Sequence, residues 1–136
     1  MTVTVGSWIA PSRALAFGLL LIAPAALFGL ANVLNDQGIG FLYALWRPFS
    51  EPPRQQIFNL VSPVVFLGGL ATALLLNVMA IARLELRWEH NELVSSVSIQ
   101  PRMPNAMLIL TAALMLVALI LYAVVENFSI VSTHVA

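Results

Sequence analysis

Two polar residues are the first candidates for chemistry in this sequence, because one lies within a long apolar stretch and the other directly follows one. Asn77 is the only strongly polar side chain well inside such a stretch, and Glu126 stands at the end of another. A buried amide can contact a substrate or an ion, or it can join two helices by a hydrogen bond. A carboxylate at a helix end can serve as a proton or cation site, or it can face water. We favour the helix–helix hydrogen bond for Asn77 and the solvated position for Glu126.

The other residue types argue against most catalytic and cofactor chemistry. The chain of 136 residues has no cysteine, which rules out disulfides, thiolate metal sites and cysteine nucleophiles. Its two histidines, His90 and His134, lie outside the apolar stretches, which argues against haem bound by buried histidines. The sequence contains no spaced His/carboxylate cluster and no nucleophile elbow, zinc-protease motif or phosphate loop. We therefore expect no cofactor, no metal and no enzymatic activity.

Three uncharged apolar stretches must position these residues, and they cover 14–34, 57–82 and 103–125. With a rise of about 1.5 Å per residue, each is long enough to cross a hydrocarbon core of about 30 Å as a helix. The whole chain is 60% hydrophobic and 9% charged, whereas soluble proteins carry about 25% charged residues. The composition predicts an all-α membrane protein, a bundle of three transmembrane helices forming one domain over 1–136.

The distribution of arginine predicts the orientation in the membrane. With three spans, the N-terminus and the loop 83–102 share one side and hold Arg13, Arg83, Arg87 and Arg102, whereas the other side holds only Arg47 and Arg54. Because short loops rich in arginine stay cytoplasmic, we expect the N-terminus inside and the C-terminus outside. A net charge of zero without a basic run argues against nucleic acid as a partner.

The first apolar stretch has a second interpretation, because an arginine before an apolar run is also typical of a secretory signal peptide. Residues 29–31, Gly-Leu-Ala, would suit a small-x-small cleavage site. The run is longer than the usual signal core, so we favour an uncleaved span. Cleavage would leave two spans.

The two loops differ in character. The outer loop, 35–56, contains the apolar segment 38–46, which is too short to span and is expected to lie on the membrane surface, with a re-entrant loop as the alternative. The inner loop, 83–102, alternates apolar and charged residues, which favours a β-hairpin with a turn at 89–92 over an extension of the second helix. That hairpin pairs Trp88 with Leu93 and Leu84 with Val97 on one apolar face. The candidate residues for docking a partner are Leu84, Leu86, Trp88, Val97 and Ile99.

Small and polar residues gather on one face of each of the first two apolar stretches. Such faces let membrane helices approach closely. The predicted packing positions are Gly18, Ala25, Gly29, Gly69, Ala73 and Asn77. A weaker line in the third stretch contains Asn105, Ala112 and Ala123.

Three segments carry a resemblance to a known family. They are Asn-Leu-Val-Ser-Pro-Val-Val-Phe-Leu-Gly-Gly at 59–69, the loop 84–102, and Tyr-Ala-Val-Val-Glu-Asn-Phe at 122–128. They resemble an uncharacterised bacterial family of small three-span membrane proteins. The resemblance covers most of the chain, and it implies a bacterial inner membrane and no particular activity.

These observations lead to a functional expectation. A patterned surface without catalytic groups suggests a non-catalytic accessory, assembly or scaffold subunit, which binds a larger membrane partner or itself through its hairpin and small-residue helix faces. The alternative is a component of a small oligomeric transporter or channel in which Asn77 and Glu126 line the path.

Overall fold

The computed structural model describes residues 2–5, 9–90 and 92–134 and contains three long helices. Helix α1 is Pro11–Asp36, α2 is Arg54–Ile81 and α3 is Met103–His134. In the described part of the chain, three helical segments are long and apolar enough to cross a membrane. This confirms the three predicted long apolar helices, each of which could cross a membrane.

The helix ends follow local chemistry. Pro11 opens α1, where a proline fits because the first N–H groups of a helix have no partner inside the helix. At the other end, Gly38 adopts a φ of 83°, which a residue with a side chain rarely adopts. Its N–H donates to the carbonyl of Asn35, and the N–H of Ile39 donates to the carbonyl of Leu34 at 2.8 Å. These paired bonds form a Schellman motif, which ends α1.

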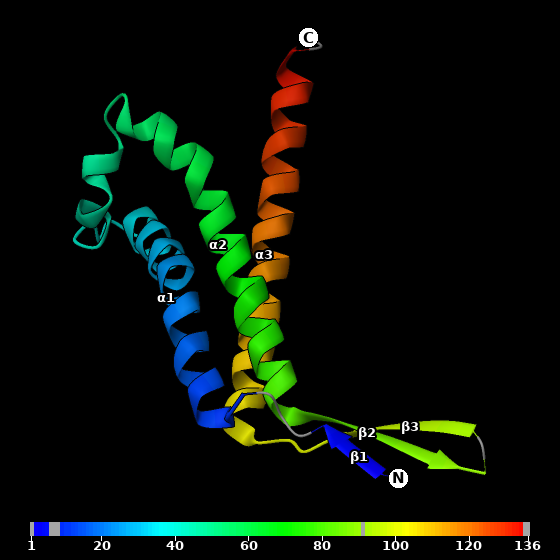
Figure 1. Cartoon of the computed structure of the whole chain (residues 1–136). Coiled ribbons are helices and arrows are strands. Elements are labelled where there is room, and N and C mark those ends of the chain that lie inside the picture. The colour runs from blue at the N-terminus through cyan, green and yellow to red at the C-terminus, as the bar shows by residue number, and fades with distance from the viewer. Residues whose placement is uncertain (1, 6–8, 91, 135–136) are drawn as a thin grey trace.

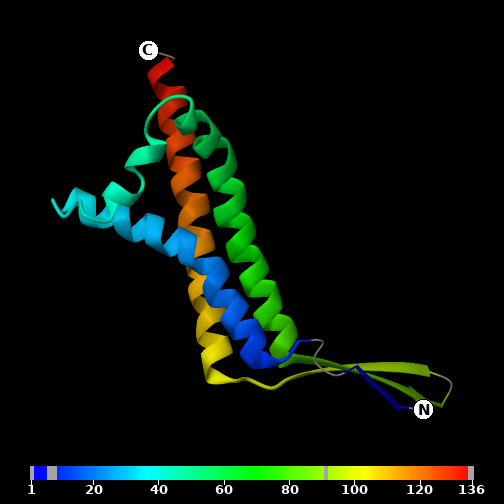
Figure 2. The same cartoon turned by 60° about the vertical axis from the view of Figure 1, so that its left-hand side comes forward.

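The two ends of the molecule differ in structure. A small sheet projects sideways from one end of the helices, and the connection between α1 and α2 lies near the other end (Figure 1). We call these the sheet end and the loop end. Helix α2 contacts both α1 and α3 more extensively than α1 and α3 contact each other. Toward the loop end, α1 leans away from the other two helices (Figure 2).

The sheet contains the predicted hairpin and one further strand. Strand β2 is Ala82–Glu89 and β3 is Glu92–Ile99, and they pair in antiparallel register with Trp88 opposite Leu93 and Leu84 opposite Val97. Both predicted pairs are therefore confirmed. Strand β1, Thr2–Val5, adds to the other edge of β2, giving the order β1-β2-β3. The sequence analysis did not predict this strand.

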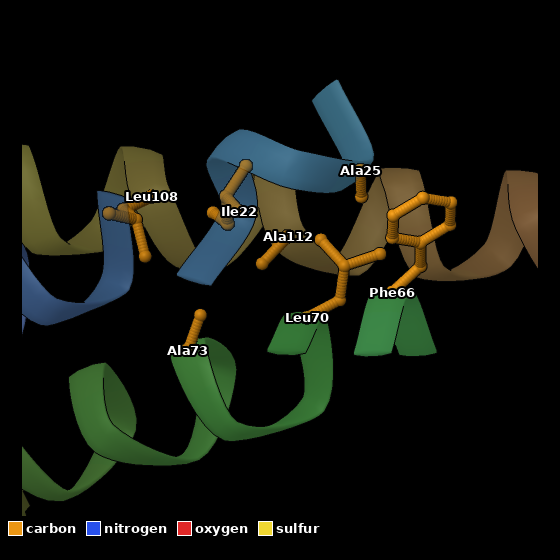
Figure 3. Close-up of a cluster of buried hydrophobic side chains, with 7 residues drawn as sticks. All are labelled: Ile22, Ala25, Phe66, Leu70, Ala73, Leu108 and Ala112. Carbon is orange, nitrogen blue, oxygen red and sulfur yellow. The ribbon is translucent and has the colours of Figure 1, made fainter. Parts of the chain in front are cut away.

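The core lies where the three helices meet. Its buried side chains point toward one another from all three helices (Figure 3), and they are Ile22, Ala25, Phe66, Leu70, Ala73, Leu108 and Ala112. Successive core positions within each helix are three or four residues apart, the spacing that keeps them on one face. Each helix contributes one alanine and at least one larger side chain to this core, so the helices pack at close range.

Part of the loop between α1 and α2 packs against both of these helices. It contains two short 3₁₀ turns, η1 at Tyr43–Leu45 and η2 at Arg47–Phe49. Between them, the Trp46 ring lies 5.6 Å from that of Phe28 on α1 and 5.8 Å from that of Phe58 on α2. These aromatic contacts occupy the space that opens where α1 leans away from α2.

Candidate functional site

The buried polar groups of the helix bundle gather at the sheet end. Asn77 lies in the last turns of α2 and is 0% exposed. Its Nδ2 group donates to the carbonyl of Ala14 on α1 at 3.0 Å and to the carbonyl of Ala73 in its own helix at 2.9 Å. Both N–H bonds of the amide are therefore used within the protein.

A second asparagine completes this arrangement. Asn105, in the first turn of α3, is 3% exposed, and its Nδ2 group donates to Asn77 Oδ1 at 2.8 Å. The same group donates to the carbonyl of Pro11 at 2.9 Å. Two amides thus join the start of α1, the end of α2 and the start of α3. We call Asn77 and Asn105 the asparagine pair.

Gly18 makes room for the asparagine pair. A Cβ atom at this position would lie 2.5 Å from Asn77 Nδ2 and 2.9 Å from Leu108 Cδ2, closer than real Cβ atoms come to their neighbours. A second close approach occurs at Gly69, where a Cβ would lie 2.8 Å from the carbonyl oxygen of Leu21. Both glycines allow α1 and α2 to approach more closely than any larger residue would permit.

The chemistry available to this site is limited. Amide side chains do not ionise near neutral pH, and the Asn77 amide is enclosed by the protein and fully hydrogen-bonded on its donor side. Among the described residues, no group of three or more His, Asp and Glu could hold a metal ion. The asparagine pair therefore sets the register of three helices, because an unpaired amide in an apolar core costs free energy.

The predicted packing residues occupy different environments. Ala25 and Ala73 are buried in the core, whereas Gly29 is exposed with nothing within 4 Å of its Cβ position. Ala123 is also exposed, in the part of α3 beyond the core. The side chain of Glu126 lies outside the described part of the structure.

The predicted docking residues lie on the sheet, at the end of the molecule opposite the loop end. Trp88, Val97 and Ile99 are exposed, and Leu86 is half-buried. The side chain of Leu84 lies outside the described part, although its backbone holds the expected register position opposite Val97. The sheet therefore brings these positions together on its surface, whereas the asparagine pair, at the same end of the molecule, is buried between the helices.

The sequence analysis placed Asn105 on the small-residue face of the third apolar stretch but did not predict its hydrogen bond with Asn77. A usable signal existed, because two asparagines near the same predicted membrane boundary need partners. Sequence reasoning also missed the packing of Trp46 against the helices, for which a short apolar loop gives no periodic signal.

Together, these features define a small helical protein whose three helices are long and apolar enough to cross a membrane, with the asparagine pair between the helices and a sheet at one end. No family model, no curated protein and no solved structure matches the chain.

Proposed function

We propose that this chain is a non-catalytic accessory, assembly or scaffold subunit of the membrane, and that its sheet binds a larger protein partner. The observation that supports this proposal is the one-sided character of the sheet. Residues paired across neighbouring strands share a face, so Trp88, Leu93 and Val97 lie on the same side. Each of the three is more than half exposed.

The opposite face of the sheet is largely polar. Its register positions include Arg83 opposite Ser98 and Arg87 opposite Val94, and Arg87 Nε lies 3.8 Å from Glu89 Oε1. An exposed pair of this kind contributes little stability, so the polar face is suited to water. The apolar face requires a cover, because a small exposed sheet with large apolar side chains is an interaction surface or an aggregation site.

The small-residue helix faces contribute less to this proposal. Gly18, Ala25 and Ala73 are buried within a single chain, so they are already used by the protein's own helices. The proposed interaction with a partner therefore rests on the sheet. The alternative, an oligomeric transporter or channel, gains no support from Asn77, because its amide is enclosed and hydrogen-bonded within one chain.

The proposed setting is the bacterial inner membrane, with the sheet in the cytoplasm. The arginine count supports this orientation, since the sheet end carries more arginines than the loop end. The resemblance to an uncharacterised bacterial family is the basis for the bacterial setting.

Site-specific photo-crosslinking in native membranes tests the proposed function. A photoreactive residue at Trp88 or Val97 is expected to form an adduct with the same protein of defined mass. The matched control is Val94, which is exposed on the opposite face and is expected to give no such adduct. Equal labelling from Val94 and Val97, or adducts with lipid alone, would contradict a protein partner on the apolar face.

A further inference from the structure

At the loop end, an apolar groove of about 330 Å³ runs along α2. Its lining includes Arg54 and Ile57 at the start of α2, and Val65 and Phe66 further along the same helix. From Arg54 to Phe66, the helix rises by about 18 Å at about 1.5 Å per residue. Half of a hydrocarbon core of about 30 Å is about 15 Å, so the groove matches the depth of one leaflet.

A smaller, more polar recess of about 170 Å³ adjoins this groove. Trp46, Phe49 and Phe58 line both spaces, so the groove and the recess share a wall. Five of the recess residues have hydroxyl or amide side chains that can hydrogen-bond to headgroup oxygens or water, and they are Asn32, Tyr43, Ser50, Gln55 and Asn59. An apolar groove beside a polar recess suits an amphiphile.

Two further observations concern the polar chemistry of this site. The indole Nε1 of Trp46 is buried and has no hydrogen-bond partner among the described residues. A buried donor of this kind requires an acceptor. Arg54 and Arg47 are both exposed and form no ion pair within the described part of the chain, although Glu51 lies between them in sequence. Of the two arginines, only Arg54 lines the groove.

We propose that this groove is a binding site for one phospholipid with an anionic headgroup. An acyl chain lies along α2 between Arg54 and Phe66, and the Arg54 guanidinium attracts the headgroup phosphate at the membrane boundary. The polar recess accommodates headgroup oxygens beside the Trp46 indole. This inference is independent of the proposed partner, which binds at the opposite end of the molecule.

Native mass spectrometry of the full chain in detergent tests this site. The protein is titrated with phosphatidylglycerol or with phosphatidylcholine of the same chain length. We expect one phosphatidylglycerol to bind more tightly than phosphatidylcholine. Arg54→Gln is expected to weaken phosphatidylglycerol binding about fivefold and to remove the preference, because one arginine near the surface contributes about that factor.

Matched variants separate this site from general attraction to lipid. Arg47→Gln removes the same charge outside the groove and is expected to retain the preference. Val65→Trp fills the groove and is expected to lower the binding of both lipids, whereas Val64→Trp changes a neighbouring exposed residue that does not line it. Circular dichroism confirms that each variant retains its helices.

Three outcomes would overturn the proposal. The first is equal binding of the two lipids by the unaltered protein, which would contradict the proposed selection of an anionic headgroup. The second is an equal effect of Arg54→Gln and Arg47→Gln, which would mean that the preference for phosphatidylglycerol depends on the overall charge of the protein and not on Arg54. The third is an equal effect of Val65→Trp and Val64→Trp, which would place the bound lipid outside the groove.

Discussion

Asn77 shows how one polar residue can be stable in a membrane-spanning core. Its amide donates to two backbone carbonyls and accepts from Asn105, so burial leaves its donors satisfied. Each hydrogen bond between membrane helices contributes on average about 0.6 kcal/mol. The larger effect is on specificity, because a shift of α2 along its axis by one turn would separate Asn77 from Ala14 and Asn105. Gly18 is the residue that permits this geometry.

The first prediction therefore concerns Gly18. Gly18→Ala places a methyl group against the Asn77 amide and Leu108, and is expected to lower the free energy of unfolding by about 1–3 kcal/mol. The matched control is Gly29→Ala, in the same helix, where the added Cβ meets open space. This control is expected to raise the free energy of unfolding by about 0.5–1 kcal/mol through reduced backbone freedom.

The measurement is reversible unfolding of the purified protein in mixed micelles, followed by circular dichroism. The two alanine substitutions should act in opposite directions. A Gly18→Ala protein as stable as the unaltered chain would mean that α1 and α2 do not approach at this residue.

At the scale of elements, the sequence predicted the features that depend on a local pattern of apolar residues. Apolar length gave the three helices, and alternation from Leu84 to Trp88 gave the hairpin and its register, because slipping by one residue would exchange its two faces. Helix ends were less accurate, and α3 continues to His134 instead of ending at residue 125. No glycine or proline occurs between residues 126 and 134, so the sequence provides no clear stop signal there.

Features that depend on contacts between distant residues were not predicted. Strand β1 has only four residues, too few for periodicity to identify, and its register is set by pairing with β2. The hydrogen bond between Asn77 and Asn105 and the ring contacts of Trp46 likewise depend on how the helices pack. In each case, the determining partner lies far away in sequence.

The second prediction concerns β1. Deleting residues 2–5 is expected to speed amide hydrogen exchange in β2, because β2 then becomes an edge strand with unpaired backbone groups. Exchange in α2 and α3 should not change. The control is Val3→Thr, which keeps a β-branched residue in the strand. Exchange measured by mass spectrometry distinguishes the two variants, and equal protection of β2 in the deletion and the control would show that β1 does not pair.

At the scale of the whole molecule, the two ends perform different structural roles. The asparagine pair and close glycine contact hold the helices together at the sheet end. At the loop end, α1 leans away and aromatic rings fill the space beside an apolar groove. The two ends therefore suit the two proposals made above, a protein partner at the sheet and a lipid in the groove.

The third prediction concerns the orientation of these ends. The chain has no cysteine, so single cysteines at Ser12, Ser50 and Ser98 can be labelled without background. All three serines are exposed. Because the arginine excess lies at the sheet end, an impermeant maleimide added to intact cells is expected to label Ser50→Cys and to spare Ser12→Cys and Ser98→Cys.

Permeabilising the membrane should then make Ser12→Cys and Ser98→Cys reactive, which serves as the control for accessibility. The reverse pattern would contradict the predicted orientation while retaining the spans. Labelling of Ser50→Cys and Ser98→Cys from the same side would show that α2 does not cross the membrane, because α2 is the only helix between them. The same comparison of Ser12→Cys with Ser50→Cys tests α1, so three single cysteines determine both the first two crossings and their direction.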